Sequence, residues 1–165
     1  GHWHQAALLD GGAEMWVEGG WPVDAATPPA RRATFTPDPQ PELVADGSWV
    51  QANLKTPGVV FLDARPAAEF VGGHIPGARG IFWKTTMAGS PPVLLGRSEL
   101  EGIFHAAGIR TGDTLVPYCN SGVQASYLYF VARYLGYETK LYDGSMAEWI
   151  KVPGAPIETG APSAQ

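Results

Sequence analysis

The sequence predicts an α/β protein with a central parallel sheet of about five strands and helices on both faces. Short runs of β-branched and apolar residues alternate along the chain with segments of helical periodicity. The two strongest strand patterns run from Val59 to Ala64 and from Thr114 to Cys119. Strands and helices that alternate at this spacing are typical of a parallel sheet that is covered on both faces.

Two helices follow from their caps and periodicity. Ser98 is expected to cap the first helix, with Glu101 in the capping-box position, and this helical pattern ends at Gly108. The second pattern places apolar residues at helical spacing from Val123 to Leu135 and stops at Gly136.

The last part of the pattern predicts one more strand and a short helix. The strand is expected from Thr139 to Asp143, and Ser145 is expected to cap a helix that carries Trp149. Pro117 lies inside a strand pattern and has no N–H to donate. We therefore expect it near the end of its strand, where no ladder hydrogen bond is lost.

Composition excludes several classes of function. With 165 residues the chain suits one complete domain, and no apolar run approaches the roughly 20 residues of a membrane helix. A net charge of −5 argues against a nucleic-acid partner, and a single cysteine excludes an internal disulfide and a multi-cysteine zinc site. No secretory signal opens the chain, so we expect a cytoplasmic protein, provided that Gly1 is the native start.

The single cysteine, Cys119, has two interpretations. Free cysteines are often small, buried apolar residues. Here, however, the residue ends a predicted strand and a helix begins within four residues, where unpaired N–H groups stabilise a thiolate. The intervening loop, Asn120 to Gln124, has Gly122 at its centre and contains no acidic residue. We therefore expect its backbone N–H groups to surround an uncovered Cys119 sulfur as an anion-binding nest.

The chain contains a short internal repeat. "LDGGAEMW", from Leu9 to Trp16, is similar to "YDGSMAEW", from Tyr142 to Trp149, with Asp, Gly and Trp in register. The later copy closes a complete unit of strands and helices, whereas the earlier copy has little sequence before it. A proline-rich segment from Ala25 to Pro41 separates the two and reads as an extended linker.

Three stretches resemble the rhodanese family of sulfurtransferases. "CNSGVQAS" is similar to the family's active-site loop, "DARPAAEFVGGHIPGA" (Asp63 to Ala78) to its other signature, and "YDGSMAEW" to its closing segment. They occur in the family's order. The resemblance implies a rhodanese-like fold.

The resemblance also implies a reaction. The Cys119 thiolate would take the outer sulfur of a small anionic donor, thiosulfate or 3-mercaptopyruvate, and pass it from a persulfide to cyanide or a thiol. The loop amides of Asn120, Ser121, Gly122, Val123 and Gln124 would stabilise the negative sulfur, so no metal or organic cofactor is expected.

Arg65 matches the family arginine that helps to hold the donor. Its alternative role is a structural ion pair with Asp63 or Glu69. His74 is expected to be a turn residue whose imidazole satisfies nearby backbone groups, and the tryptophans are expected in the core, although Trp83 is a candidate to line the donor pocket.

Donor preference stays open. Loops that prefer thiosulfate often carry a cation directly after the cysteine, whereas Asn120 and Ser121 are neutral. The run Ser121, Gly122, Val123 resembles loops that prefer 3-mercaptopyruvate, but Asn120 and Gln124 depart from that pattern.

Tandem members of the family carry two such domains, and only the second has the catalytic cysteine. We therefore expect residues 1–24 to be the tail of a preceding rhodanese domain, which is a candidate partner as a separate chain. Residues 25–42 are then the linker, 43–160 the catalytic domain and 161–165 a tail.

Two alternatives remain. One is a dual-specificity phosphatase, which needs histidine before the cysteine and arginine six residues after it. Tyr118 and Ala125 occupy those positions, so the sequence argues against this alternative. The other alternative is a catalytically silent rhodanese-like module that carries sulfur or binds a partner.

Overall fold

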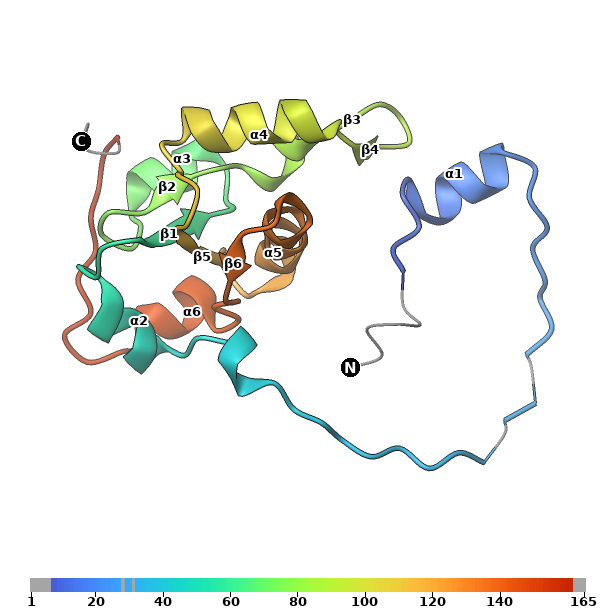
Figure 1. Ribbon diagram of the computed structural model, residues 1–165, viewed down its shortest axis with the longest axis horizontal. Helices are drawn as coiled ribbons and strands as arrows, with labels where there is room; N and C mark the ends of the chain where they lie inside the picture. Colours follow the sequence, from blue (N-terminus) through green and yellow to red (C-terminus); the bar gives the residue numbers. More distant parts are fainter. Residues whose placement is uncertain (1–6, 28, 31, 162–165) are drawn as a thin grey trace.

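A computed structural model describes residues 7–27, 29–30 and 32–161. Its central sheet is parallel and has four strands in the order β2-β1-β5-β6 (Figure 1). The bounds are β1 Val59–Asp63, β2 Arg79–Gly80, β5 Thr114–Tyr118 and β6 Glu138–Thr139. The α/β prediction is confirmed. Four strands replace the expected five or so, and an isolated parallel bridge from Val44 to Leu141 extends the sheet beyond β6.

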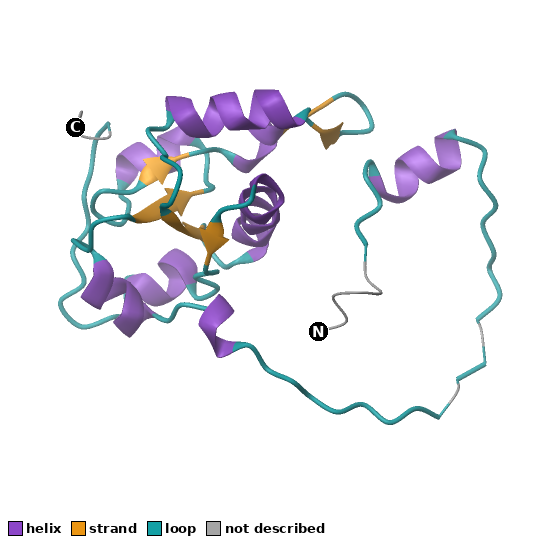
Figure 2. Cartoon of the chain, in the orientation of Figure 1, coloured by secondary structure: helices purple, strands orange, loops and turns teal. Residues whose placement is uncertain are grey.

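Helices cover both faces of the sheet (Figures 1 and 2). One apolar cluster joins Leu62 and Leu115 of the sheet to side chains such as Phe104 and Leu128, which belong to the two longest helices. The other cluster joins Phe61 and Val116 to three short helices. The helices on the first face are α4 Arg97–Ala106 and α5 Val123–Leu135, and those on the second are α2 Gly47–Asn53, α3 Ala67–Gly72 and α6 Ser145–Trp149.

Smaller elements complete the domain. The 3-10 helices are η1 Pro41–Leu43 and η2 Trp83–Thr86, and an antiparallel pair is formed by β3 Met87–Ala88 and β4 Val93–Leu94. Within the residues described, no helix is long and apolar enough to cross a bilayer.

Pro117 lies next to last in β5, near the end of its strand as expected. The expectation that no ladder hydrogen bond is lost was wrong, and the lost bond accounts for the shortness of β6. In a parallel pair the N–H and carbonyl of one residue face the same neighbour. The Pro117 carbonyl accepts the Tyr142 N–H (3.1 Å), so its absent N–H faces the β6 side as well. The regular ladder consequently ends with Leu115 opposite Thr139, and the predicted strand from Thr139 to Asp143 was too long.

Helix α4 begins one residue before the predicted cap. Gly96 is the N-cap, and the Glu99 carboxylate accepts the Gly96 N–H (3.1 Å). Glu101 instead forms an ion pair with Arg97 (2.9 Å), so the assignment of Ser98 and Glu101 to the cap was wrong. Serine is a preferred N-cap residue, but at this helix the Glu99 carboxylate, three residues after Gly96, accepts the N-cap N–H.

The N-terminal helix α1, Gly12–Glu18, has no buried residue. Leu8 and Leu9 remain more than half exposed, and the Asp10 carboxylate accepts the Leu94 N–H (2.9 Å) at the β3–β4 pair. The described residues from Gly20 to Gln40 form no helix or strand. The assignment of residues 1–24 to another domain stays a prediction.

We expect Trp149 to contribute much of the stability of the second apolar cluster. It is fully buried and its indole N–H donates to the Pro156 carbonyl (3.0 Å). We expect Trp149→Ala to lower the free energy of unfolding by about 3 to 5 kcal/mol, because it leaves a cavity and an unpaired carbonyl. Ile150→Ala, at the exposed next residue, should change it by less than about 0.5 kcal/mol. Denaturant titration measures both, and equal effects would contradict this view of the core.

Candidate functional site

Cys119 directly follows β5, and α5 begins at Val123, so the predicted order of strand, cysteine, loop and helix is confirmed. The residue is 1% exposed and belongs to the apolar cluster under α4 and α5, so the expectation of an uncovered sulfur is wrong for this structure. The cysteine thus lies at the carboxyl edge of a parallel sheet, where ligand sites of such folds gather.

Ser145 holds the loop in place. Its hydroxyl oxygen accepts the N–H groups of Cys119 (3.0 Å) and Gly122 (3.1 Å), while the hydroxyl donates to the Tyr142 carbonyl (3.0 Å). The residue is fully buried and has a φ of 53°, in the left-handed region that costs free energy for a residue other than glycine. The sequence predicted Ser145 as a helix cap. Instead Gly144 is the N-cap, and the serine side chain binds the cysteine loop.

The backbone of α6 orients the next peptides of the loop. The N–H groups of Met146 and Ala147 donate to the carbonyls of Cys119 (3.1 Å) and Asn120 (3.0 Å). In a planar trans peptide, a carbonyl and the following N–H point in opposite directions. The N–H groups of Asn120 and Ser121 therefore point away from α6.

The start of α5 provides further donors. The Ser126 N–H bonds back to the Gly122 carbonyl (2.8 Å), so the N–H groups of the helix before Ser126 are the usual unpaired donors of a helix start. Gly122 does not contribute a donor to the expected nest, because its N–H donates to the Ser145 hydroxyl oxygen instead. Among the described residues no hydrogen bond to the Cys119 sulfur is found. A complete nest around the sulfur therefore stays a prediction.

Gly122 is required by close packing. Its φ is 88°, and a Cβ there would overlap the Asp143 carboxylate and lie 2.9 Å from the Asp143 carbonyl oxygen. Although the loop contains no acidic residue, the fold thus brings the Asp143 carboxylate against it. A side chain at position 122 would force the loop and the segment before α6 apart.

Arg65 forms the structural ion pair that was one of its two expected roles. Its guanidinium binds the Asp63 carboxylate through Nε (2.9 Å) and Nη2 (2.6 Å), and Nη2 also donates to the Gly73 carbonyl (2.7 Å). Burial opposes the charge, but the hydrogen bonds and charge of Asp63, with the charge of Glu69, raise the pKa of Arg65. A role in binding a donor stays a prediction.

Glu69 connects this ion pair to the cysteine loop. One of its carboxylate oxygens lies 4.0 Å from Arg65 Nη1 and accepts the Asn120 side-chain amide (2.7 Å). Glu69 and Asn120 are 51 positions apart in the sequence, so no local sequence pattern predicts their contact. Together with Asp143, Glu69 makes the surroundings of the loop more acidic than its own sequence suggested.

The neighbouring Tyr118 and His74 have structural partners. The Tyr118 hydroxyl accepts the Ile75 N–H (3.1 Å), and burial together with the Asp63 charge raises the pKa of Tyr118 well above its usual value. His74 is fully buried, stacks on Phe70 and places Nδ1 2.8 Å from the Phe70 carbonyl. The expected backbone-satisfying role of His74 is therefore confirmed.

The other residues that the sequence predicted for the site lie at or near the surface. Asn120, Ser121 and Val123 are exposed, and the half-buried Gln124 has a buried side-chain oxygen without a hydrogen-bond partner in the described structure. Trp83 packs against the cluster that holds Cys119 and meets Tyr127 edge to face, with ring centroids 5.8 Å apart. That packing supports its expected place in the core, while a contact with the donor stays a prediction. Trp21, by contrast, is 59% exposed, so the expectation that the tryptophans lie in the core is wrong for this residue.

Curated sulfurtransferases are similar to most of the chain. It is 36% identical over 164 residues to a probable 3-mercaptopyruvate sulfurtransferase of Pseudomonas aeruginosa, with 93% of this chain and 57% of that protein covered. It is 34% identical over 172 residues to a putative thiosulfate sulfurtransferase of Synechococcus elongatus, with 93% and 53% covered. The chain thus spans about half the length of these relatives.

Solved structures and a family model agree with this likeness. The wild-type structure of EanB superposes with a TM-score of 0.83 at 25% identity and covers 93% of this chain and 41% of that one. The structure of YnjE gives a TM-score of 0.79 at 26% identity, with 93% and 42% covered. The model of the rhodanese-like domain matches residues 46–152. Because this match covers more than half of the chain, the chain belongs to the family of rhodanese-like domains.

Proposed function

We propose that the chain transfers a sulfane sulfur through a persulfide on Cys119. The observation that carries the proposal is the position of this cysteine, between the carboxyl end of β5 and the start of α5 in a rhodanese-like domain. The Cys119 thiolate attacks the outer sulfur of the donor and forms a new S–S bond. The bond from that sulfur to the rest of the donor breaks, which releases sulfite from thiosulfate or the enolate of pyruvate from 3-mercaptopyruvate. The enolate carbon takes up the proton that the donor thiol loses and becomes pyruvate. Cyanide or a thiolate then attacks the outer sulfur and regenerates the Cys119 thiolate.

The loop backbone supports this chemistry. The Asn120 and Ser121 N–H groups point away from α6, and the first N–H groups of α5 have no partner in their own helix. Fixed donors of this kind stabilise negative charge without reorganisation during the reaction. The substrate-binding residues of the proposal are accordingly Asn120 to Gln124, with Gly122 acting by its conformation because its N–H is bonded to Ser145.

The electrostatics favour 3-mercaptopyruvate over thiosulfate as donor. The Arg65 guanidinium is engaged by the Asp63 carboxylate, and Glu69 and Asp143 bring negative charge to the loop. A thiosulfate dianion meets more repulsion there than the single carboxylate of 3-mercaptopyruvate. The relatives include proteins named for each of the two donors.

A second function is favoured by one relative. The sulfur carrier protein TtuD of Thermus thermophilus is 29% identical over 175 residues, with 93% of this chain and 61% of that protein covered. In this alternative the Cys119 persulfide forms but passes its sulfur to a protein thiol, and turnover with cyanide is slow. Residues 1–24, as the tail of a preceding rhodanese domain, would place that domain beside the catalytic one as a further partner.

Incubation with a donor should add the mass of one sulfur atom to the protein. Cyanide should remove that mass and release thiocyanate, whereas Cys119→Ser should show neither step, because no thiolate remains to hold the sulfur. Intact-protein mass spectrometry measures the first step and thiocyanate colorimetry the second. Sulfur that persists on Cys119→Ser would refute the mechanism, and loading of the wild-type protein without thiocyanate release would favour the carrier function.

Loss of the Ser145 hydroxyl should impair the loop. Ser145→Ala leaves two buried N–H groups without an acceptor and should cost about 1 to 3 kcal/mol of stability. Ser145→Gly also removes the hydroxyl but relieves the positive φ, so it separates the loss of loop contacts from strain. Both variants should load sulfur at least about tenfold more slowly at a temperature where they are folded, which corresponds to about 1.4 kcal/mol.

Ser126→Ala is the matched control for this experiment. Ser126 is an exposed serine of α5 whose hydroxyl donates to the Val123 carbonyl (2.8 Å). Its replacement should leave the rate of persulfide formation nearly unchanged. A wild-type rate of persulfide formation in both Ser145 variants would show that the Ser145 hydroxyl is not needed for the reaction.

Charge at Glu69 should affect the two donors unequally. Glu69→Gln keeps an amide oxygen that can accept the Asn120 amide but removes one negative charge from the rim. Because one exposed charge contributes about 1 kcal/mol at 4 Å in water, kcat/KM for thiosulfate should rise up to about fivefold relative to that for 3-mercaptopyruvate. Glu101→Gln, in the α4 ion pair, should leave the ratio unchanged. A ratio that moves toward 3-mercaptopyruvate in Glu69→Gln would contradict the electrostatic argument.

A further inference from the structure

A cavity lies along the β2 edge of the sheet, beside the start of β1. It has a volume of about 680 Å³, within the range of small-molecule sites. Its lining begins near Val59, at the start of β1, and extends along β2, where Arg79 and Gly80 pair with Leu62 and Asp63. No residue of the Cys119 loop belongs to this lining. The cavity is therefore distinct from the proposed sulfur site.

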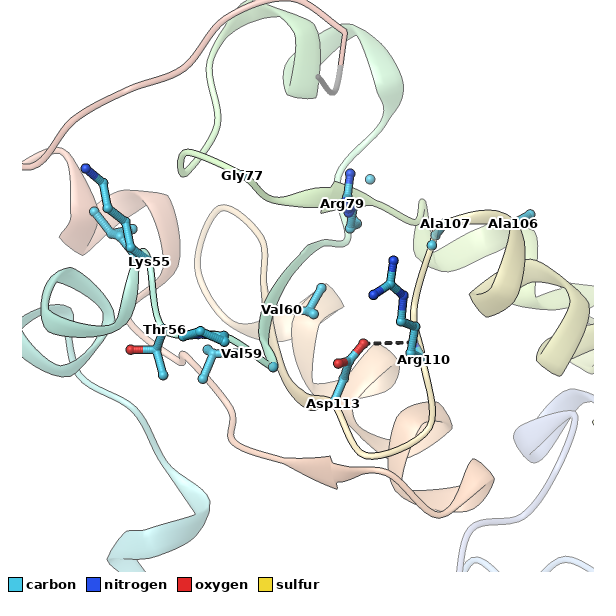
Figure 3. Close-up of a pocket in the computed structure, with 15 residues that line it drawn as sticks. Lys55, Thr56, Val59, Val60, Gly77, Arg79, Ala106, Ala107, Arg110 and Asp113 are labelled. Atoms are coloured by element: carbon cyan, nitrogen blue, oxygen red, sulfur yellow. Dashed lines mark hydrogen bonds between the residues drawn. The ribbon is translucent and has the colours of Figure 1, made fainter. Parts of the chain in front are cut away.

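Cationic side chains surround this cavity. Lys55 follows α2, Arg79 belongs to β2, and Arg110 lies in the turn after α4. Arg79 is paired with Leu62, whose side chain packs under α4, so Arg79 projects from the same face of the sheet that Arg110 adjoins. Figure 3 shows Arg79 and Arg110 on one side of the cavity and Lys55 on the other, with the Lys55 side chain directed away from the two arginines.

These three cations have no ion-pair partner among the residues that the structure describes. Asp113 is the carboxylate in the lining, and one of its oxygens accepts the Arg110 backbone N–H (2.7 Å) instead of pairing with a guanidinium (Figure 3). Glu158 reaches the rim at Gly77, where it accepts the backbone N–H (2.8 Å), and lies 3.9 Å from His74. In a chain of net charge −5, an unpaired group of cations around a cavity is unexpected.

The lining leaves room for a ligand to approach the backbone. A Cβ on Gly58, Gly77 or Gly108 would meet no atom within 4 Å. Val59, Val60 and Leu54 add apolar surface beside the cations. The cavity thus combines positive charge with an apolar wall and exceeds the size of a single inorganic anion.

We propose that this cavity binds a small organic polyanion through a phosphate or pyrophosphate group held by Arg79 and Arg110. The planar guanidinium fork matches phosphate oxygens in pairs, and two such forks on one side of a cavity suit adjacent phosphoryl groups. The apolar wall contacts the organic part of the ligand. The proposal is independent of sulfur transfer, because no residue of the Cys119 loop lines the cavity.

Binding is tested with inorganic pyrophosphate and inorganic phosphate as probes, by isothermal titration calorimetry of the full chain at low ionic strength. We expect saturable binding at one site, tighter for pyrophosphate than for phosphate, that weakens as salt is added. Arg79→Gln and Arg110→Gln should each weaken pyrophosphate binding about tenfold, because each removes one charged pair of phosphate hydrogen-bond donors. The double variant should show no saturable binding.

Two controls isolate the cavity. Arg133→Gln removes one exposed cation of α5, near Glu138 and outside the cavity lining, and should leave pyrophosphate affinity unchanged. Cys119→Ser should bind pyrophosphate as the wild-type chain does, so failure of the sulfur chemistry cannot be mistaken for failure of this site. Absence of saturable pyrophosphate binding by the wild-type chain would overturn the proposal. Equal affinity of the wild-type chain and a folded double variant would do so too.

Discussion

The Ser145 hydroxyl is the contact on which the geometry of the cysteine loop depends. It joins the end of β5 to the start of α6 by accepting two loop N–H groups, and α6 completes the joint by donating to two loop carbonyls. With these four bonds formed, the loop has little freedom in how its peptides turn. The same four bonds hold the start of α6 close to the cysteine, and Ser145, its first residue, has a positive φ there.

The position of α6 follows in turn from Pro117. Because this residue offers no N–H to the β6 side, the ladder ends early and the chain after Thr139 is released from regular pairing. The segment still touches the sheet through Tyr142, then turns and enters α6. A residue that looks unsuited to an inner strand thus allows the chain to bring Ser145 under the loop.

Local sequence predicted the elements that depend on nearest neighbours. The apolar runs of β1 and β5, the periodicity of α5 and its stop at Gly136 were sufficient to place the cysteine between strand and helix. Contacts between distant residues were not predictable in the same way. The bond between Ser145 and Cys119 spans 26 positions and that between Asn120 and Glu69 spans 51, and no sequence spacing predicts either contact. The cation-lined cavity was missed for the same reason, because its three charges come from three separate elements.

The close approach at Gly122 divides the loop into a fixed part and a variable part. Position 122 faces the backbone and carboxylate of Asp143 and has no volume to spare, whereas Asn120, Ser121 and Val123 face solvent. Because the Asn120 amide donates to Glu69, only Ser121 and Val123 can be exchanged without loss of a side-chain hydrogen bond. A combinatorial library built on those two positions could therefore explore new acceptors or donors, with Cys119, Asn120 and Gly122 held constant.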